Sequence, residues 1–243
     1  MTRPRLLLLK CGAAPREMAA RCGDYQDWFS QGLRGVPWDL VEPYQGAFQK
    51  PDLAAYAGVL ISGSPRSVSR PEPWMEEVAD LVRAAHRRGT PVLGVCFGHQ
   101  LIAWAFGGRV IRNPRGWELG TVDVEMTSDG RADPLFRGLG GPKGCLRVNE
   151  THEDAVDELS LPAGMRVLAQ NAQTPVQALA YGDHVRGVQF HPEVTAAAAR
   201  EYCVRRADQV GLERAHALAQ AATDTPDGER VLANFVDCFV ARS

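Results

Sequence analysis

The stretch from Pro91 to Gly108, PVLGVCFGHQLIAWAFGG, decides the fold that we expect. Its first part, 91–95, is a short apolar run typical of a buried strand, and 98–106 then follows helical spacing until two glycines end it. Cys96 therefore falls on a strand-to-helix turn, where we expect its side chain to be exposed. Because the unpaired N–H groups and the dipole of a helix N-terminus stabilise negative charge, such a turn favours the thiolate form of a cysteine.

Both strands and helices are expected before this turn. Apolar runs predict strands, and a segment with proline and acids early and Arg, His and glycine late predicts a helix. We expect strands at 5–9, 38–41 and 58–61, and helices at 17–31 and 73–88. Strands that alternate with helices indicate an α/β fold with an open, mostly parallel sheet and helices on both faces, whose ligand sites lie at the carboxyl ends of the strands.

The pattern changes after residue 109. Short strand candidates between Gly, Pro and Asp turns predict a small antiparallel β element, at 119–126, 146–149, 165–169, 176–181 and 185–189. From about residue 195 we expect a helical C-terminal extension, with helices at 196–207 and around 231–240. Since there is no internal repeat and no long linker, we expect residues 1–243 to form a single domain.

Composition and charge narrow the class of protein. The 243 residues carry a formal net charge of -2, with Lys and Arg scattered along the chain, which argues against a nucleic-acid partner. The leucine run at 6–9 is too short for a signal-peptide core or a membrane span, so we expect a cytoplasmic protein that does not bind a membrane. Six cysteines at wide, irregular spacing favour reduced thiols.

A second segment, residues 187–193 (GVQFHPE), has the side chains for acid–base chemistry. The end of a strand would deliver His191 to a site, and Glu193 could orient the imidazole and favour its cationic form. The residues alone leave alternatives open. Cys96 could be a small buried hydrophobe, and a lone His-Pro-Glu is usually a surface turn.

Together the two segments resemble a known family. Residues 94–100, GVCFGHQ, resemble the nucleophile motif of class I glutamine amidotransferases, and residues 187–193 resemble the motif that carries the histidine and glutamate of that family. The resemblance implies a flavodoxin-like fold and a catalytic triad of Cys96, His191 and Glu193, with no cofactor and no metal. It is closest to the glutaminase domain of GMP synthetase and its stand-alone relatives.

The resemblance extends to groups that would hold the substrate. Residues 61–68, ISGSPRSV, look like the family's oxyanion turn, which implies that the backbone N–H groups of Ser64 and Phe97 stabilise the tetrahedral oxyanion. Residues 149–154, NETHED, resemble the family's Ser-His-Gly-Asp stretch, with glutamate in place of the glycine. The implied substrate-binding residues are Gln100, Thr151, His152, Glu153 and Asp154.

The implied activity is cysteine-dependent hydrolysis of a γ-glutamyl amide through a thioester, with glutamine or a γ-glutamyl peptide as the small-molecule substrate. The His-x-Asp pattern at 152–154 looks more like the γ-glutamyl peptidase-like branch, whose members act alone. Roughly fifty residues follow Glu193, too few for a synthetase domain of ordinary size. If ammonia is transferred, the partner would therefore be a separate synthetase subunit.

Three other interpretations stay open. The turn at Cys96 also suits other cysteine hydrolases or stress proteins on flavodoxin-like sheets, and the domain could be a non-catalytic binding module. Cys96, His99, His191 and Glu193 could instead be metal ligands, although one Cys-x-x-His pair falls short of paired zinc spacing.

Two further features are weaker. The loop 115–118 could line the mouth of a pocket, or its Trp117 could serve packing alone. Cys11, near the end of the first strand, could be mistaken for a second nucleophile but has no matched base.

Overall fold

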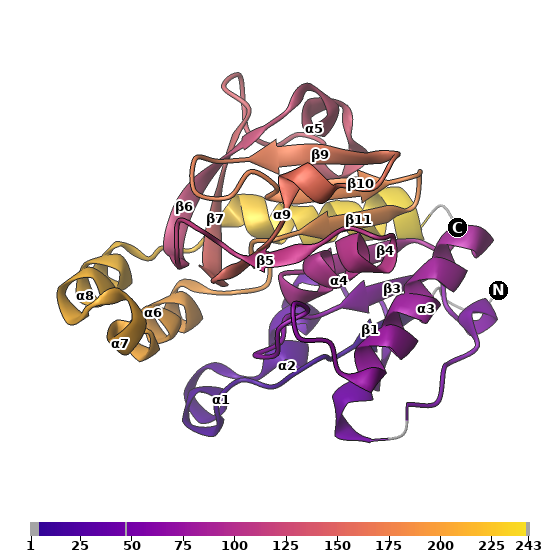
Figure 1. Cartoon of the computed structure of the whole chain (residues 1–243), viewed down its shortest axis with the longest axis horizontal. Helices are drawn as coiled ribbons and strands as arrows, with labels where there is room; N and C mark the ends of the chain where they lie inside the picture. The colour runs from indigo at the N-terminus through magenta and orange to yellow at the C-terminus, as the bar shows by residue number, and fades with distance from the viewer. Residues whose placement is uncertain (1–4, 47, 242–243) are drawn as a thin grey trace.

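The computed structural model describes residues 5–46 and 48–241, and most of its strands join one long sheet (Figure 1). Nine strands lie in the order β2-β1-β3-β4-β11-β10-β9-β6-β7. Their bounds are β1 Leu6–Leu9, β2 Trp38–Val41, β3 Gly58–Ile61, β4 Val92–Val95, β6 Glu118–Met126, β7 Cys145–His152, β9 Met165–Gln170, β10 Ala178–Tyr181 and β11 Val185–Val188. A separate antiparallel pair joins β5 (Val110–Arg112) to β8 (Asp154–Val156).

The long sheet has two halves that differ in strand direction. The strands from β2 to β11 pair in parallel, whereas β11, β10, β9, β6 and β7 pair antiparallel. The structure confirms the predicted α/β, flavodoxin-like class with a small antiparallel element. That element is the β5–β8 pair, however, whereas the strands from which it was predicted continue the main sheet beyond β4.

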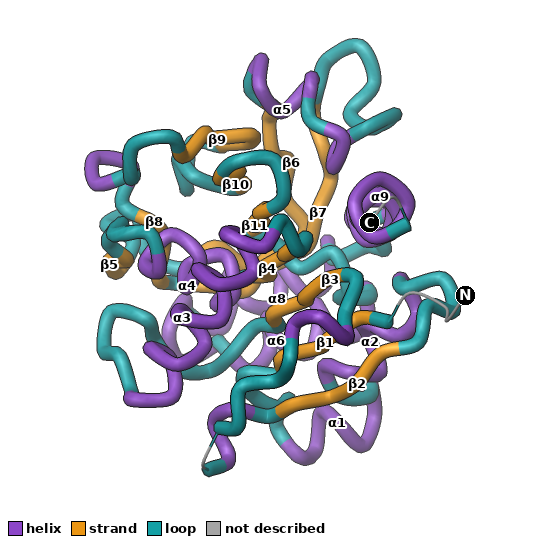
Figure 2. Tube along the Cα trace, turned by 90° about the vertical axis from the view of Figure 1, so that its right-hand side faces the viewer, coloured by secondary structure: helices purple, strands orange, loops and turns teal. Residues whose placement is uncertain are grey.

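Helices cover both faces of the parallel half. Their bounds are α1 Arg16–Cys22, α2 Tyr25–Gly32, α3 Pro73–Arg88, α4 Phe97–Ala105, α5 Ser128–Ala132, α6 Ala196–Arg205, α7 Ala207–Val210, α8 Leu212–Ala221 and α9 Pro226–Phe235. Figure 2 shows α3 and α4 on one side of β1, β3 and β4, with α9 on the other side. Because successive strand residues face opposite sides, Leu6 and Leu8 share a core cluster with α2 and α9, and Leu7 and Leu9 share one with α3 and α4.

The helix expected at 17–31 is two helices. Gly23 adopts φ 82°, and Asp24 then caps α2 in a reciprocal capping box with Asp27. The box satisfies N–H groups that a continuous helix would have paired internally, so the break at Gly23 is a specified boundary.

The tail is helical from Ala196 onward but more divided than expected. The helix predicted at 196–207 ends at Arg205, two further helices follow, and the last apolar segment is α9 continued by a π-helix at Val236–Val240. Met18 and Trp28 pack with Ala198 and Tyr202, which fixes α6 beside α1 and α2. Among the described helices, none combines the length and apolar character needed to cross a bilayer.

Candidate active site

Cys96 occupies a strained turn between β4 and α4. It is the N-cap of α4, with φ 51° and ψ -101°, and only Arg34 shares a positive φ among the described non-glycine residues. A β-carbon added at Gly98 would lie 2.5 Å from the carbonyl oxygen of Ile61, and one at Gly94 would overlap the backbone of Gly98. These two glycines therefore let α4 sit directly on β3 and β4, the arrangement of a nucleophile elbow.

The turn itself is buried. Cys96 is 7% exposed, so the expectation that its side chain sits on an exposed turn is wrong. The cause is the close seating of α4 on the sheet, which packs Cys96 into the same core cluster as Val95 and Val188. The backbone N–H of Cys96 also donates to the carbonyl of Val188, 2.8 Å away, and so ties the nucleophile turn to β11.

His191 and Glu193 lie just beyond the end of β11, the strand that runs parallel to β4 with Val188 opposite Val95. The Nδ1 atom of His191 is 2.8 Å from an Oε1 oxygen of Glu193, and both side chains are buried. Burial lowers the pKa of His191, but the Glu193 carboxylate and the Cys96 sulfur raise it more, so the pKa lies well above its usual value. This arrangement favours an imidazolium that faces the cysteine.

The Nε2 atom of His191 has no aligned hydrogen-bond partner among the described residues, although the Cys96 sulfur is near enough to raise the histidine's pKa. Gly63 keeps this space open, because a β-carbon there would lie 3.1 Å from Cε1 of His191 and 3.9 Å from Cβ of Cys96. The structure thus brings together the three residues of the expected triad.

The two expected oxyanion donors flank the same site. Ser64 follows β3, its φ is not in the left-handed region, and its hydroxyl accepts a hydrogen bond from the N–H of Arg66 at 3.1 Å. Phe97 is the first residue of α4, where a backbone N–H has no helical acceptor. Serine in place of glycine at position 64 is therefore compatible with an ordinary backbone conformation.

A cavity of about 400 Å³ opens next to Cys96. Its wall holds both oxyanion candidates and all five expected substrate-binding residues. The complete lining is Ser64, Pro65, Arg66, Ser67, Ser69, Arg70, Cys96, Phe97, Gln100, Arg112, Trp117, Thr151, His152, Glu153, Asp154 and Arg206. The cavity therefore joins the carboxyl ends of the parallel strands to residues of the antiparallel half.

Several of these wall residues already have partners within the chain. Gln100 donates to the carbonyl oxygen of Asp154 at 2.8 Å and to the side chain of Gln189 at 3.0 Å, and Nδ1 of His152 is 3.0 Å from the same Asp154 carbonyl. The carboxylate of Asp154 contacts the hydroxyl of Ser67. Gln100 and His152 thus fix the bend at Asp154, which leaves the Asp154 carboxylate at the cavity wall.

Glu153, which stands where the family has glycine, is paired with Arg112. Two nitrogens of the Arg112 guanidinium reach one oxygen of Glu153, the closer bond spanning 2.5 Å. The added negative charge is therefore compensated at the cavity rim.

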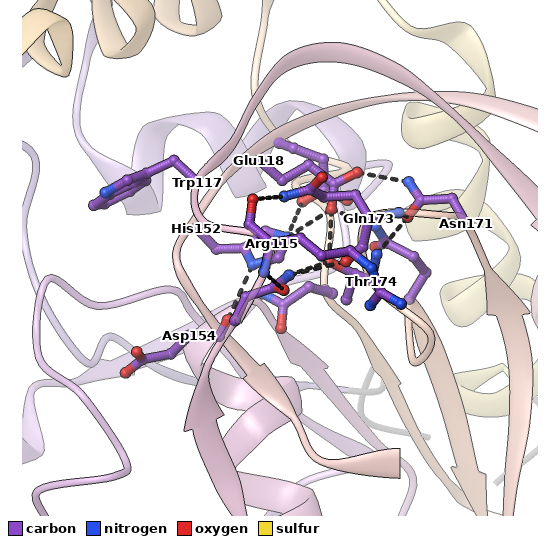
Figure 3. A network of polar contacts seen from close by, with 12 residues as sticks. Arg115, Trp117, Glu118, His152, Asp154, Asn171, Gln173 and Thr174 are labelled. Atoms are coloured by element: carbon purple, nitrogen blue, oxygen red, sulfur yellow. Dashed lines mark hydrogen bonds and ion pairs between the residues drawn. The ribbon is translucent and has the colours of Figure 1, made fainter. Parts of the chain in front are cut away.

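A buried polar cluster lies behind His152 and was not anticipated from the sequence. Nε2 of His152 is 3.2 Å from Glu118 and 3.3 Å from Glu150. Figure 3 shows Glu118 surrounded by partners, which include Asn171 and Thr174. Asn149, next to Glu150 on β7, accepts the backbone N–H of His191 at 2.8 Å, so this cluster adjoins the candidate triad.

The two acids of this cluster have opposite electrostatic environments. Burial raises the pKa of Glu118, but His152 and the hydroxyl and amide donors lower it more, so that carboxyl ionises more easily than usual. Burial and the nearby Glu118 carboxylate raise the pKa of Glu150 well above its usual value. No sequence pattern marks Glu150, because a charged residue within a strand is usually solvent-facing.

Trp117 and the carboxylate of Asp154 point away from this cluster (Figure 3), toward the cavity that both line. Trp117 does more than pack, because the guanidinium of Arg206 lies over its ring at 4.4 Å. Of residues 115–118, Trp117 lies in the cavity wall, whereas Glu118 begins β6 and is buried, so the pocket-lining interpretation holds for Trp117 and not for the loop as a whole.

His99 and Cys11 take other positions. His99 is fully buried against the backbone of Gly187 and Val176, and burial lowers its pKa to about 3. Within residues 5–46 and 48–241, the one group of three potential metal ligands found close together is Glu118, Glu150 and His152, which excludes His99 and Cys96. The thiol of Cys11 is also buried, and its pKa is raised by burial.

Comparisons with known proteins show the family to which the sequence is similar. Residues 33–207 match the family model described as glutamine amidotransferase class-I. The chain is 34% identical over 163 residues to gamma-glutamyl peptidase 5 of Arabidopsis thaliana, covering 67% of this chain and 64% of that protein. It is 37% identical over 141 residues to a subunit of the glutamine-hydrolyzing GMP synthase of Pyrococcus abyssi, covering 57% of this chain and 66% of that protein.

A solved structure shares the fold at lower identity. The crystal structure of a glutamine amidotransferase from Thermotoga maritima superposes with a TM-score of 0.69 at 21% identity, covering 99% of both chains.

Proposed function

This chain belongs to the class I glutamine amidotransferase family, and we propose that it hydrolyses a γ-glutamyl amide with Cys96 as nucleophile. The observation that carries the proposal is the position of Cys96 on a strained elbow, facing the buried pair of His191 and Glu193. The similarity to an enzyme named gamma-glutamyl peptidase supports the same class of substrate.

In the proposed reaction the Cys96 thiolate attacks the amide carbon of the substrate. The negative charge on the carbonyl oxygen is stabilised by the backbone N–H groups of Ser64 and Phe97, each worth about 3 kcal/mol. His191, held as an imidazolium by Glu193, gives its proton to the leaving amine as the C–N bond breaks. The neutral imidazole then takes a proton from water, which cleaves the γ-glutamyl thioester and restores the free thiolate and the imidazolium.

We propose that Gln100, Thr151, His152, Glu153 and Asp154 hold the glutamyl end of the substrate, by contact or by shaping the wall. Thr151 supports this assignment, because its buried hydroxyl has no hydrogen-bond partner among the described residues and it lines the cavity. The reaction needs no metal or cofactor in this scheme. The cytoplasm is the proposed location, supported by six free cysteines within the described chain.

The experiment is product release by the purified chain, offered L-glutamine and a panel of γ-glutamyl dipeptides together with glutathione. We expect turnover of at least one substrate, abolished in Cys96→Ala and retained in Cys11→Ala, which removes a buried thiol without a base. Equal turnover by Cys96→Ala and the unmodified chain would remove the proposed nucleophile.

A second candidate function is that of a glutaminase which delivers ammonia to a separate synthetase subunit. The similarity to the GMP synthase subunit of Pyrococcus abyssi favours it. This function predicts slow ammonia release from glutamine by the chain alone, with strong stimulation by the synthetase.

A further inference from the structure

The cavity beside Cys96 has more positive than negative side chains in its wall. Four arginines line it, at positions 66, 70, 112 and 206, against two acids, Glu153 and Asp154. Arg112 pairs with Glu153, and Arg66 lies 3.1 Å from Glu72. Within the described part of the chain, Arg70, Arg206 and Asp154 form no ion pair, so two positive charges and one negative charge of the wall are left for a ligand.

Arg206 is the better fixed of these two cations. It caps the C-terminal end of α6, its guanidinium stacks on Trp117 at 4.4 Å, and its Nε atom is buried with no hydrogen-bond partner among the described residues. A buried guanidinium nitrogen without an acceptor is unfavourable in the free protein. Arg206 lines the cavity, and its planar guanidinium is of the kind that binds a carboxylate with two hydrogen bonds.

The two candidate substrate types differ in their number of carboxylates, and arginines in the cavity wall can distinguish them by charge. Glutamine has one carboxylate, and its leaving group is ammonia. A γ-glutamyl amino acid or peptide has a second carboxylate, on the portion that leaves. Two unpaired arginines beside one nucleophile therefore match a substrate with two carboxylates better than they match glutamine.

We propose that Arg206 is a specificity-determining residue that binds the carboxylate of the leaving portion, so that this chain acts on γ-glutamyl amino acids and peptides in preference to glutamine. Trp117 is its positioning residue, because the ring holds the guanidinium plane at the cavity mouth. This assignment rests on the proposed function, since it gives the substrate class of the same site.

The test compares γ-glutamylglycine with γ-glutamylglycinamide, which differ only in whether the leaving portion ends in a carboxylate. We expect kcat/KM to favour the carboxylate by about tenfold or more, mostly through KM, and the preference to shrink as salt rises. In Arg206→Gln the ratio is expected to fall toward one. The control Arg200→Gln, on the same helix but outside the cavity wall, is expected to keep the ratio of the unmodified chain.

The outcomes separate this inference from the proposed function. Cleavage of both compounds with equal efficiency, or an unchanged ratio in Arg206→Gln, would overturn the role of Arg206 and leave the hydrolase proposal standing. If neither compound nor glutamine is cleaved, the hydrolase proposal fails. Calorimetric binding of the same two compounds to Cys96→Ala then tests Arg206 without turnover, and equal affinities would overturn its assignment.

Discussion

The two halves of the sheet contribute different parts of the candidate site. The parallel half supplies Cys96 after β4 and His191 after β11, both at carboxyl ends of neighbouring strands. The antiparallel half adds part of the cavity wall, from Trp117 just before β6, from Thr151 and His152 at the end of β7, and from the bend at 153–154. Backbone geometry therefore positions the reacting groups, whereas pairing between side chains shapes the part of the cavity wall that would select the substrate.

The largest expected effect comes from the base in the parallel half. We expect His191→Ala to lower kcat by about a thousandfold, because the imidazole beside Cys96 is the proposed group that gives and takes the proton. Steady-state rates with the best γ-glutamyl substrate give the measurement. His216→Ala, an exposed histidine on α8, is the matched control and should keep full activity. A normal kcat in His191→Ala would contradict the claim that the parallel half supplies the reacting groups.

A backbone change in the parallel half is expected to act mainly through stability. In Gly98→Ala the new β-carbon meets the carbonyl oxygen of Ile61, so we expect a loss of about 3 kcal/mol in the free energy of unfolding. Gly116→Ala is the comparison, since its β-carbon meets nothing within 4 Å and only its φ of 77° is strained, at about 1 kcal/mol. Equal losses in urea unfolding would argue against a sterically locked elbow.

The pairing of His191 with Glu193 predicts a pH effect. The Glu193 carboxylate helps to raise the pKa of His191, so the imidazolium persists to higher pH than an ordinary histidine allows. Glu193→Gln removes that contribution and should move the alkaline limb of kcat/KM to lower pH, with a rate loss of about tenfold to a hundredfold. An alkaline limb that stays in place in the pH profile would mean that Glu193 does not tune the base.

The smallest effects are expected for Glu118 and Glu150, the two buried acids of the antiparallel half. Their replacement should change the free energy of unfolding in opposite directions. The pKa of Glu118 is lowered in the fold, so its carboxylate stabilises the protein above the unfolded-state pKa and that stability is lost as pH falls. We expect Glu118→Gln to lower the free energy of unfolding by about 2 kcal/mol at neutral pH.

The pKa of Glu150 is raised in the fold. Above the pKa of the unfolded state, the unfolded chain lowers its free energy by ionising this carboxyl and the folded chain does not, so the protein loses stability as pH rises. We therefore expect Glu150→Gln to be more stable than the unmodified chain by about 1 kcal/mol at neutral pH, with no gain in acid. Unfolding curves at several pH values provide the check, and a Glu150→Gln chain destabilised at neutral pH would show that the two acids share one role.

The parallel half could be read from local sequence, and the antiparallel half only in part. The strands at Trp38–Val41 and Gly58–Ile61 and the helix at Pro73–Arg88 have the predicted bounds, because apolar runs, proline and glycine mark their ends. The break at Gly23 also has a local signal, because Asp24 and Asp27 have the spacing of a capping box. The break was not predicted, because a glycine in a polar stretch does not by itself end a helix.

The parts that could not be predicted depend on contacts between distant segments. Glu150 is buried among Glu118 and His152, which pairing between β6 and β7 brings together, and Trp117 meets Arg206 at the end of α6, which packs beside α1 and α2. No spacing or motif in the sequence predicts the burial of Glu150 or the contact between Trp117 and Arg206. The burial of Cys96 was missed for a related reason, since it depends on how closely Gly98 lets α4 approach the sheet.

The most direct test of the central claim is the intact mass of the chain, quenched in acid during turnover of a slow γ-glutamyl amide. We expect a mass increase of one γ-glutamyl group, located on the peptide that contains Cys96 and absent from Cys96→Ala. A label on any other residue, or no label from a sample whose Cys96→Ala variant also turns over, would contradict it.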